Sequence, residues 1–333
     1  MGKVAVLGAG SWGIALANHY KTLGHDVILW GRDEAVLSEV KATGLSKKYF
    51  SEVASLGSLI ETTLELSQAV NEANLVVFSL PSSATRKVAS EIELAGIKLT
   101  AKQLVLSTAK GLEKGTDLRM SELLQSIFVN SKVGVLSGPS FAHEIIQGKP
   151  AALTLASDTL ETASIFQNLT HSSAMRIYTS DDLIGVELGG TIKNIIAIAA
   201  GVVDGAEIGV NARAALLTRG LAEMSRLILA AGGKLETVMG LSGMGDLILT
   251  ATSDLSRNRR VGLSLGRGGS LAGALKEIAQ VSEGVYSAAQ VVDLGNKFNV
   301  QLPVCQEVLK LLEGKNSVKE SVKALLSRIP VRE

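Results

Sequence analysis

The first twenty residues hold a strand, a glycine loop and a helix in immediate succession, and this succession constrains the fold more than any other feature. Residues 3–7 (KVAVL) form an apolar run typical of a buried strand, residues 8–13 (GAGSWG) follow directly, and the small residues 14–17 (IALA) come next. Gly8 permits a tight turn, and Gly13 lets the helix pack closely on the strand. We therefore expect a strand-helix unit here and further such units after it.

The glycine loop also predicts a ligand. In the order strand, turn and helix, the spacing GxGxxG leaves Gly10 without a side chain where a pyrophosphate group approaches the backbone. The N–H groups at the start of the helix then hold the phosphates. Outside this context the same glycines would mark only a structural turn. The context favours a dinucleotide-binding site that includes Gly8, Gly10 and Gly13.

The second predicted strand, residues 27–30 (VILW), ends in Gly31, Arg32 and Asp33. A carboxylate at about this place binds the ribose of NAD, whereas an arginine pairs with the 2′-phosphate of NADP. The arginine comes first, which favours NADP, while Asp33 leaves NAD open. The alternative for Arg32 is a solvated surface side chain. After the third predicted strand, residues 80–83 (LPSS) form another polar turn at a strand end, where ligands of such sheets lie.

The pattern of the chain changes near residue 182. Before it, short apolar runs alternate with helical segments, which predicts a mostly parallel, doubly wound sheet of Rossmann type. After it, apolar residues recur at spacings of three and four, which is typical of helices. We predict an α/β dinucleotide-binding domain over residues 1–182 and an all-α domain over residues 183–333. The predicted strands are residues 4–7, 27–30, 75–80, 104–108, 133–137 and 151–155.

Composition and charge exclude several other classes of protein. The length of 333 residues exceeds that of one usual hydrophobic core, and 46% apolar with 20% charged residues is typical of a folded globular protein. The 33 basic and 32 acidic side chains nearly cancel, so no global field recruits nucleic acid or an anionic membrane. A single cysteine, Cys305, cannot form an internal disulfide, and no Cys/His cluster predicts a metal site.

The N-terminus does not have the arrangement of an export signal, because no distinct charged segment, apolar core and cleavage site follow one another there. The most apolar stretch, residues 192–203, is shorter than the roughly 20 residues that span a bilayer, and it contains Lys193 and Asn194. We interpret this stretch as a buried helix. We expect a cytoplasmic protein without membrane insertion.

Lys193 is the candidate for catalysis. If the dinucleotide serves hydride transfer to a ketone, the new alkoxide needs a proton donor, and the same group is the base in the reverse direction. On a helix over residues 181–203, the residues three and four positions from Lys193 are Gly189, Gly190, Ile196 and Ala197. Small and apolar neighbours desolvate an amine and lower its pKa, and the two glycines leave room for a ligand. The alternative is a lysine that extends to water from a half-buried helix.

Three further stretches predict contacts with a small anionic substrate. Lys110 follows the fourth predicted strand, and residues 137–144 (SGPSFAHE) combine a Gly-Pro turn with Ser140, which is placed to cap the next helix. In the helical half, residues 243–246 (GMGD) precede residues 256–260 (SRNRR), where arginine and asparagine beside a serine form a phosphate cradle. Taken singly, each stretch has an ordinary structural explanation, such as a loop, a helix cap or a solvated helix start.

These motifs occur in the order found in the bacterial NAD(P)-dependent glycerol-3-phosphate dehydrogenase family, which the chain resembles over nearly its full length. The motifs that carry the resemblance are GAGSWG, WGR, STAKGLE, SGPSFAHE, GTIKN, NARAALLTRGLAEM, GMGDLILTATSDLSRNRR and SEGVYSA. The resemblance implies reversible hydride transfer between NAD(P)H and dihydroxyacetone phosphate, which gives sn-glycerol 3-phosphate, a precursor for glycerophospholipid synthesis. It implies NADP or NAD as the cofactor, an all-α substrate-binding domain over residues 183–333 and a phosphorylated triose as the substrate. Between the two cofactors, Arg32 favours NADPH. The sequence does not fix the oligomeric state, for which a homodimer is our hypothesis.

The resemblance also implies the residues of the site. Lys193 matches the proton acceptor in glycerol phosphate oxidation. The positions that match substrate contacts are Lys110, Gly138, Ser140, Lys193, Asp246, Ser256, Arg257 and Asn258. The positions that match cofactor contacts, together with the glycines of the loop, are Ser11, Trp12, Arg32, Lys110, Ala142, Arg257, Val281 and Glu283. No metal ligand is among them.

Two other functions compete with this one. A two-domain dehydrogenase for a hydroxy acid or a sugar acid would act on a carboxylate, whereas residues 256–258 and the SGPSFAHE stretch favour a phosphate ester. A non-catalytic nucleotide-binding or redox-sensing protein would keep the glycine loop but would not need Lys193 or Asp246. Both residues are present.

Overall fold

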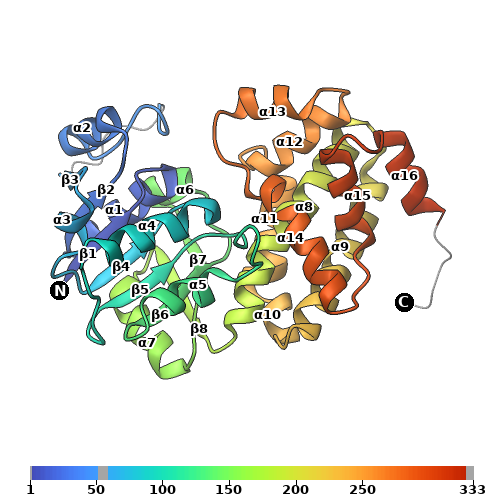
Figure 1. Cartoon of the computed structure of the whole chain (residues 1–333). Helices are drawn as coiled ribbons and strands as arrows, with labels where there is room; N and C mark the ends of the chain where they lie inside the picture. Colours follow the sequence, from blue (N-terminus) through green and yellow to red (C-terminus); the bar gives the residue numbers. More distant parts are fainter. Residues whose placement is uncertain (1, 52–58, 328–333) are drawn as a thin grey trace. The chain divides into compact units, whose positions relative to one another are not determined.

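The computed structural model describes residues 2–51 and 59–327, and these residues form two compact units (Figure 1). The first unit consists of Met1–Ala109 and Leu118–Leu183, and the second of Lys110–Asp117 and Ile184–Glu333. The segment Lys110–Asp117 therefore packs with the second unit, although it lies within the first domain that the sequence predicts. The boundary between residues 182 and 183 stays a prediction. Met1 and residues 328–333, at the ends of the two predicted domains, lie outside the described residues.

The first unit is built around one sheet in the strand order β3-β2-β1-β4-β5-β6-β7-β8. Its strands are β1 (Lys3–Leu7), β2 (Asp26–Trp30), β3 (Glu61–Thr63), β4 (Leu75–Phe78), β5 (Leu104–Ser107), β6 (Lys132–Ser137), β7 (Ala151–Ser157) and β8 (Met175–Ser180). Neighbouring strands are parallel except for the antiparallel pair β6 and β7. The strand order reverses between β1 and β4, which is the switch point where ligands bind in such sheets. The prediction of a doubly wound Rossmann-type sheet is confirmed.

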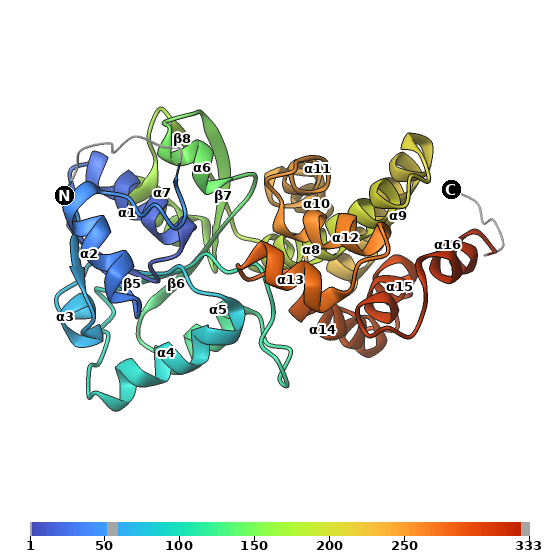
Figure 2. The ribbon, with the colours of Figure 1, turned by 90° about the horizontal axis from the view of Figure 1, so that it is seen from above.

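Helices cover both faces of this sheet, and Figure 2 shows α1, α6 and α7 on one side and α3, α4 and α5 on the other. The helices of the first unit are α1 (Ser11–Thr22), α2 (Glu34–Thr43), α3 (Leu66–Val70), α4 (Ser82–Leu94), α5 (Met120–Ile127), α6 (Ala142–Ile146) and α7 (Leu160–Thr170). Residues alternate along β1: Val4 and Val6 join the core beneath α1 and α7, while Ala5 and Leu7 join the core beneath α3 and α4. A strand buried on both faces is apolar at every position, which explains the continuous apolar runs in the sequence.

Two strands of the sheet were not among the predicted ones. β3 has only three residues, which is too short to show a period of two. β8 alternates buried Met175 and Ile177 with exposed Arg176 and Tyr178 at the edge of the sheet, so it lacks an apolar run. Because β3 was missed, the strands predicted as third, fourth and fifth are β4, β5 and β6.

Within its described residues the second unit consists of helices joined by loops and contains no strand, so the prediction of an all-α domain is confirmed. Its helices are α8 (Leu183–Gly205), α9 (Val210–Ala230), α10 (Leu235–Met239), α11 (Asp246–Thr252), α12 (Arg257–Gly266), α13 (Leu271–Ile278), α14 (Glu283–Lys297), α15 (Pro303–Leu312) and α16 (Val318–Leu326), with a π-helical turn at Leu241–Gly245. By length and composition alone α8 could cross a membrane, but its apolar window is 100% buried inside the structure. The prediction of a buried helix at this place is confirmed.

Glycines bring the backbones of α8 and α12 into direct contact. A Cβ atom at Gly201 would lie 2.1 Å from the carbonyl oxygen of Arg259, and one at Gly262 would lie 2.0 Å from that of Ile198. One turn further along, Gly205 and Gly266 repeat the close approach. No side chain separates the two helices here, so the start of α12 is held in a fixed register beside α8.

Candidate functional site

The glycine loop joins β1 to α1 at the switch point of the sheet. Gly8 has a φ of +118°, and a Cβ there would lie 2.3 Å from the carbonyl oxygen of Ser79. A Cβ at Gly13 would lie 1.8 Å from the carbonyl oxygen of Gly8, whereas nothing lies within 4 Å of the Cβ position of Gly10. Backbone packing therefore requires Gly8 and Gly13, while the surface at Gly10 is open.

The open surface at Gly10 continues into the start of a helix. Gly10 is the N-cap of α1, without a side-chain cap, and the helix begins with Ser11 and Trp12. The first N–H groups of any helix lack acceptors within it, so they attract an anion. A loop free of side chains beside such N–H groups fits the pyrophosphate of a dinucleotide.

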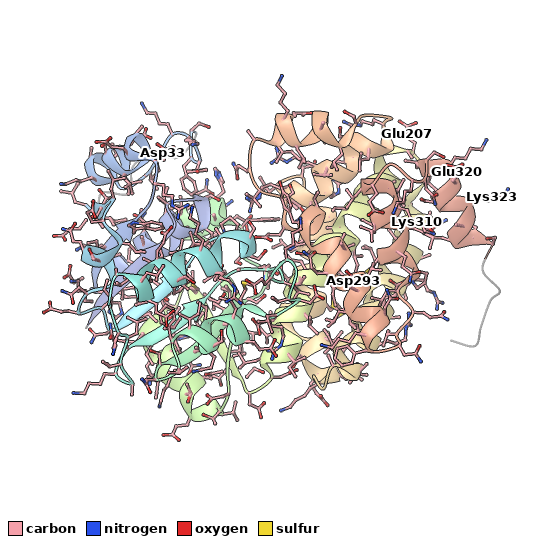
Figure 3. All side chains as sticks on the ribbon, in the orientation of Figure 1. Asp33, Glu207, Asp293, Lys310, Glu320 and Lys323 are labelled. Carbon is pink, nitrogen blue, oxygen red and sulfur yellow. The ribbon has the colours of Figure 1, made fainter. Side chains whose placement is uncertain are left out.

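Arg32 and Asp33 follow β2 and are both engaged with other side chains. The Nη2 atom of Arg32 donates to both carboxylate oxygens of Glu91 on α4 at 3.2 Å, and its guanidinium lies 5.6 Å from the ring centre of Trp30. Asp33, labelled in Figure 3, accepts from the N–H of Val36 at 3.2 Å and thereby caps α2. Its other oxygen accepts from Lys48 at 2.8 Å. This hydrogen bond holds the pKa of Asp33 below its ordinary value.

The loop after β6 carries Gly138 and Ser140. Gly138 has a φ of +127°, a conformation that favours glycine. The hydroxyl of Ser140 donates to the carbonyl oxygen of Gly138 at 2.9 Å. α6 begins at Ala142 after the N-cap Phe141, without a side-chain cap. The prediction that Ser140 caps this helix is therefore wrong, because its hydroxyl turns back to its own loop.

In the second unit, Lys193 lies on α8 and is 5% exposed. Its Nζ atom donates to Oδ1 of Asp246 at 2.9 Å and to Oγ1 of Thr250 at 2.7 Å. The other carboxylate oxygen of Asp246 accepts from Nζ of Lys110 at 2.6 Å. Asp246 begins α11, directly after the π-helical turn. One buried carboxylate thus holds two lysines that are 83 residues apart in the chain, and Lys193 does not extend to water.

Burial and charge set the proton affinities of this cluster. Burial lowers the pKa of Lys193 to about 8; the Asp246 carboxylate opposes this shift, while the positive charges of Lys110 and Arg257 add to it. Burial alone would raise the pKa of Asp246, but the two lysine ammonium groups outweigh it and hold that pKa below its ordinary value. Asp246 therefore stays ionised, while Lys193 is poised to gain or lose a proton near neutral pH.

The room left by one glycine beside Lys193 is already filled. A Cβ at Gly189 would lie 2.9 Å from the carbonyl oxygen of Ser242, which belongs to the π-helical turn. The expectation that Gly189 leaves space for a ligand is therefore wrong. Its missing side chain instead lets the turn approach α8 and present Asp246 to Lys193.

A second set of contacts runs through two asparagines. Asn194 on α8 donates to the carbonyl oxygens of Lys110 and Gly190, both at 3.2 Å. It accepts from Nδ2 of Asn258 at 2.9 Å, and Oδ1 of Asn258 accepts from the N–H of Gly284 at 3.0 Å. Asn194 thus binds the segment that carries Lys110 to both α8 and α12.

The start of α12 carries the predicted phosphate cradle. Ser256, 3% exposed, is the N-cap and accepts from the N–H of Arg259 at 3.2 Å. Arg257 is half-buried, and its Nη1 donates to Gln280 at 3.4 Å. Asn258 is buried. Val281 precedes Ser282, the N-cap of α14, and Glu283 is the first residue of that helix, followed by Gly284, which contacts Asn258.

The structure adds two residues that sequence reasoning did not select. Thr250 and Asn194 lie within hydrogen-bond distance of Lys193 and Asn258, respectively. Thr250 stands four residues after Asp246, a spacing that places both on one face of a helix. That spacing could have identified Thr250. For Asn194, the one feature of the sequence that could have indicated a role in the site was its position next to Lys193.

A doubly wound sheet with an open glycine loop, joined to a helical unit with a buried lysine–carboxylate cluster, defines the class of two-domain nicotinamide-dependent dehydrogenases. Comparison with known proteins then narrows this class. Residues 3–163 match the model of the NAD-dependent glycerol-3-phosphate dehydrogenase N-terminus, and residues 182–323 match that of its C-terminus.

Individual relatives agree with these family matches. The chain is 44% identical to a glycerol-3-phosphate dehydrogenase (NAD(P)+) of Polynucleobacter asymbioticus, with 98% of each chain covered. It is 45% identical to that of Thioalkalivibrio sulfidiphilus, covering 98% of this chain and 97% of the relative. The crystal structure of glycerol-3-phosphate dehydrogenase from Coxiella burnetii is 37% identical, with a TM-score of 0.92, and the match covers 98% of this chain and 99% of that one. The chain belongs to the NAD(P)-dependent glycerol-3-phosphate dehydrogenase family, so it is an oxidoreductase.

Proposed function

We propose that this protein catalyses the reversible reduction of dihydroxyacetone phosphate to sn-glycerol 3-phosphate, with NADPH favoured over NADH and with Lys193 as the acid/base. The observation that supports this most strongly is the buried contact between Lys193 and Asp246 at 2.9 Å. A lysine with a pKa of about 8 both donates and accepts a proton within the working range of an enzyme.

The roles of the cluster follow from its hydrogen bonds. In the reductive direction, the ammonium of Lys193 gives a proton to the substrate oxygen as it becomes an alkoxide, and in the oxidative direction the neutral amine takes it back. An ammonium has three donors, and Asp246 and Thr250 accept two of them. The third is available for the substrate. A bound nicotinamide supplies the hydride in one direction and accepts it in the other.

The start of α12 supplies the chemistry for the substrate phosphate. Arg257 offers a planar guanidinium that binds phosphate oxygens with several donors. Ser256 offers a hydroxyl donor, and Asn258 has a second amide N–H beyond the one donated to Asn194. We assign Lys110, Asp246, Gly138 and Ser140 as the further substrate contacts.

The cofactor contacts that we propose belong to three groups. The glycine loop and the start of α1 hold the pyrophosphate through Gly8, Gly10, Ser11, Trp12 and Gly13. Arg32 binds the 2′-phosphate of NADPH. The remaining contacts are Lys110, Ala142, Arg257, Val281 and Glu283.

The setting of the reaction is part of the proposal. The product, sn-glycerol 3-phosphate, is a precursor for glycerophospholipid synthesis. We place the enzyme in the cytoplasm. The burial of α8 supports the absence of membrane insertion, and the near-zero net charge supports the absence of a nucleic-acid partner. A homodimer is the assembly that we propose. The domain over residues 1–182 binds the dinucleotide, and that over residues 183–333 binds the substrate.

The test is to follow the absorbance of NADH and NADPH separately with dihydroxyacetone phosphate as the oxidant. We expect oxidation of both cofactors, faster with NADPH at low concentration. A panel of 2-keto acids and unphosphorylated dihydroxyacetone serves as the control. Equal or faster reaction with a keto acid would overturn the assignment of a phosphorylated triose.

A further inference from the structure

Glu91 lies next to the residue to which we assign recognition of the 2′-phosphate. Both of its carboxylate oxygens accept from Nη2 of Arg32 at 3.2 Å. Glu91 belongs to α4 and Arg32 follows β2, so the contact joins two elements that are 59 residues apart in the chain. The two side chains are 38% and 53% exposed. A ligand that binds the guanidinium of Arg32 therefore lies close to the carboxylate of Glu91, which is already hydrogen-bonded to the same group.

We propose that Glu91 is a specificity-determining residue, which weakens the binding of NADPH relative to NADH and so keeps both cofactors usable. This inference rests on the proposed role of Arg32 in the cofactor site. A 2′-phosphate carries close to two negative charges, whereas the 2′-hydroxyl of NADH is neutral. The carboxylate of Glu91 competes with the 2′-phosphate of NADPH for the guanidinium of Arg32, and it repels that phosphate. It does not repel the neutral 2′-hydroxyl of NADH.

The opposite effect, in which Glu91 helps by holding Arg32 in place, is the weaker one. An exposed ion pair contributes little to orientation, since much of its attraction is screened by water and salt. The guanidinium also lies 5.6 Å from the ring centre of Trp30, and this contact does not depend on Glu91. We therefore expect Arg32 to keep its position when the carboxylate is removed. The repulsion between Glu91 and the phosphate then decides the direction of the change, so that removing the charge of Glu91 strengthens NADPH binding.

Asp33 is the other carboxylate beside Arg32, and its charge is already compensated. One of its oxygens accepts from Lys48 at 2.8 Å and the other from the N–H of Val36 at the start of α2. Glu91, in contrast, is paired with Arg32 itself. The charge that an NADPH phosphate meets at Arg32 is therefore that of Glu91 rather than that of Asp33.

The experiment measures the dissociation constants of NADPH and NADH for the full chain by isothermal titration calorimetry. The variants are Glu91→Gln, Arg32→Ala and, as a matched control, Glu93→Gln, which removes the same charge from an exposed position of α4. We expect Glu91→Gln to lower the dissociation constant of NADPH about threefold to tenfold. This is the effect expected from removing a unit charge a few ångström from the ligand at an exposed site. NADH should change by less than about twofold. The tightening should shrink at high salt, because screening weakens exposed charges.

The three variants separate failure of this inference from failure of the proposed cofactor site. In one outcome, Arg32→Ala weakens the binding of NADPH selectively, while Glu91→Gln leaves NADPH binding unchanged, weakens it, or tightens the binding of both cofactors equally. The proposed role of Glu91 is then wrong, and that of Arg32 stands. An equal tightening by Glu93→Gln would also overturn the inference, since it would reflect general charge. If Arg32→Ala weakens both cofactors equally or neither, Arg32 does not recognise the 2′-phosphate, and the inference fails with it.

Discussion

The ammonium nitrogen of Lys193 lies 2.9 Å from Oδ1 of Asp246, and the two side chains are only 7% and 2% exposed. Lys110 contacts the same carboxylate at 2.6 Å. Two ammonium groups and one carboxylate leave the protonated cluster with a net charge of +1. A buried cluster of this charge attracts an anionic substrate, although the whole chain has a formal net charge of only +1.

Replacement of Lys193 by alanine should abolish most of the turnover. We expect kcat to fall at least ~10²-fold, the usual low end for loss of a general acid/base. Cofactor binding should survive, because Lys193 is not among the proposed cofactor contacts and the glycine loop belongs to the other unit. Steady-state kinetics together with calorimetric titration of NADPH would test both statements. Near-normal turnover in the variant would exclude Lys193 as the acid/base.

The pH dependence of the rate should differ in sign between the two directions. Oxidation needs the neutral amine of Lys193, so its rate should rise as the pH increases through about 8. Reduction needs the ammonium, so its rate should fall over the same range. Because Asp246 raises the pKa of Lys193, Asp246→Asn should move both midpoints to lower pH. Midpoints that stay in place in this variant would mean that another group titrates.

Arg257 should matter far more for phosphorylated than for unphosphorylated substrate. Loss of a hydrogen bond to a charged group removes about 1.5–3 kcal/mol, so Arg257→Ala should lower kcat/KM for dihydroxyacetone phosphate roughly tenfold to more than a hundredfold. Weak activity on dihydroxyacetone should change little. Asn258→Ala is the companion variant, although it also removes the donor to Asn194. If both variants lose activity equally on the two substrates, the phosphate binds elsewhere, with Lys110 as the first candidate.

Glu223 should make stability depend on pH. This carboxyl on α9 is 1% exposed and accepts from the N–H groups of Val304 and Cys305 at the start of α15. Burial raises its pKa from 4.5 to about 7, so the folded state binds the proton more tightly than the unfolded state. Its contribution favours folding at low pH and is lost as the pH rises from about 4.5 through about 7. The loss amounts to about 3 kcal/mol.

The variant Glu223→Gln should lack this pH dependence, since glutamine stays neutral. Denaturant unfolding followed by circular dichroism between pH 4.5 and 8 would measure it, with the exposed Glu236→Gln as the control. A wild-type free energy of unfolding that rises or stays constant relative to Glu223→Gln across this range would contradict the prediction.

The glycine contact between α8 and α12 should tolerate no added methyl group. Gly262→Ala would place a Cβ 2.0 Å from the carbonyl oxygen of Ile198, so one of the helices must move. We expect a loss of about 1–3 kcal/mol of stability, as for other overpacked cores, and a higher KM, because α12 carries Arg257. Gly273→Ala on α13 is the control, as its Cβ would approach only the Ser270 hydroxyl, at 3.2 Å. Equal melting temperatures for the two variants would contradict the expected strain.

Local sequence spacing was enough to predict the features that depend on neighbouring residues. The loop over residues 8–13 follows from the φ freedom of glycine. The two-part architecture follows from short apolar runs in the first half and a helical period of three to four in the second, and the buried helix around Lys193 follows from its apolar composition. These patterns are properties of a short segment, so no long-range contact is needed to recognise them. The strands β3 and β8 escaped prediction because β3 has only three residues, while β8 alternates buried with exposed residues and so lacks a continuous apolar run.

Tertiary structure alone decided which polar groups meet. Lys193 contacts Asp246 across 53 residues, Asn194 contacts Asn258 across 64, and Arg32 contacts Glu91 across 59. The hydroxyl of Ser140 turned back to Gly138, and the space at Gly189 was taken by backbone. The sequence of a short segment determines on which face of a helix or strand a side chain lies. The packing of helices and strands determines which residues that side chain contacts. Burial among those partners then sets the pKa of Lys193, which residue type alone would leave at its ordinary value.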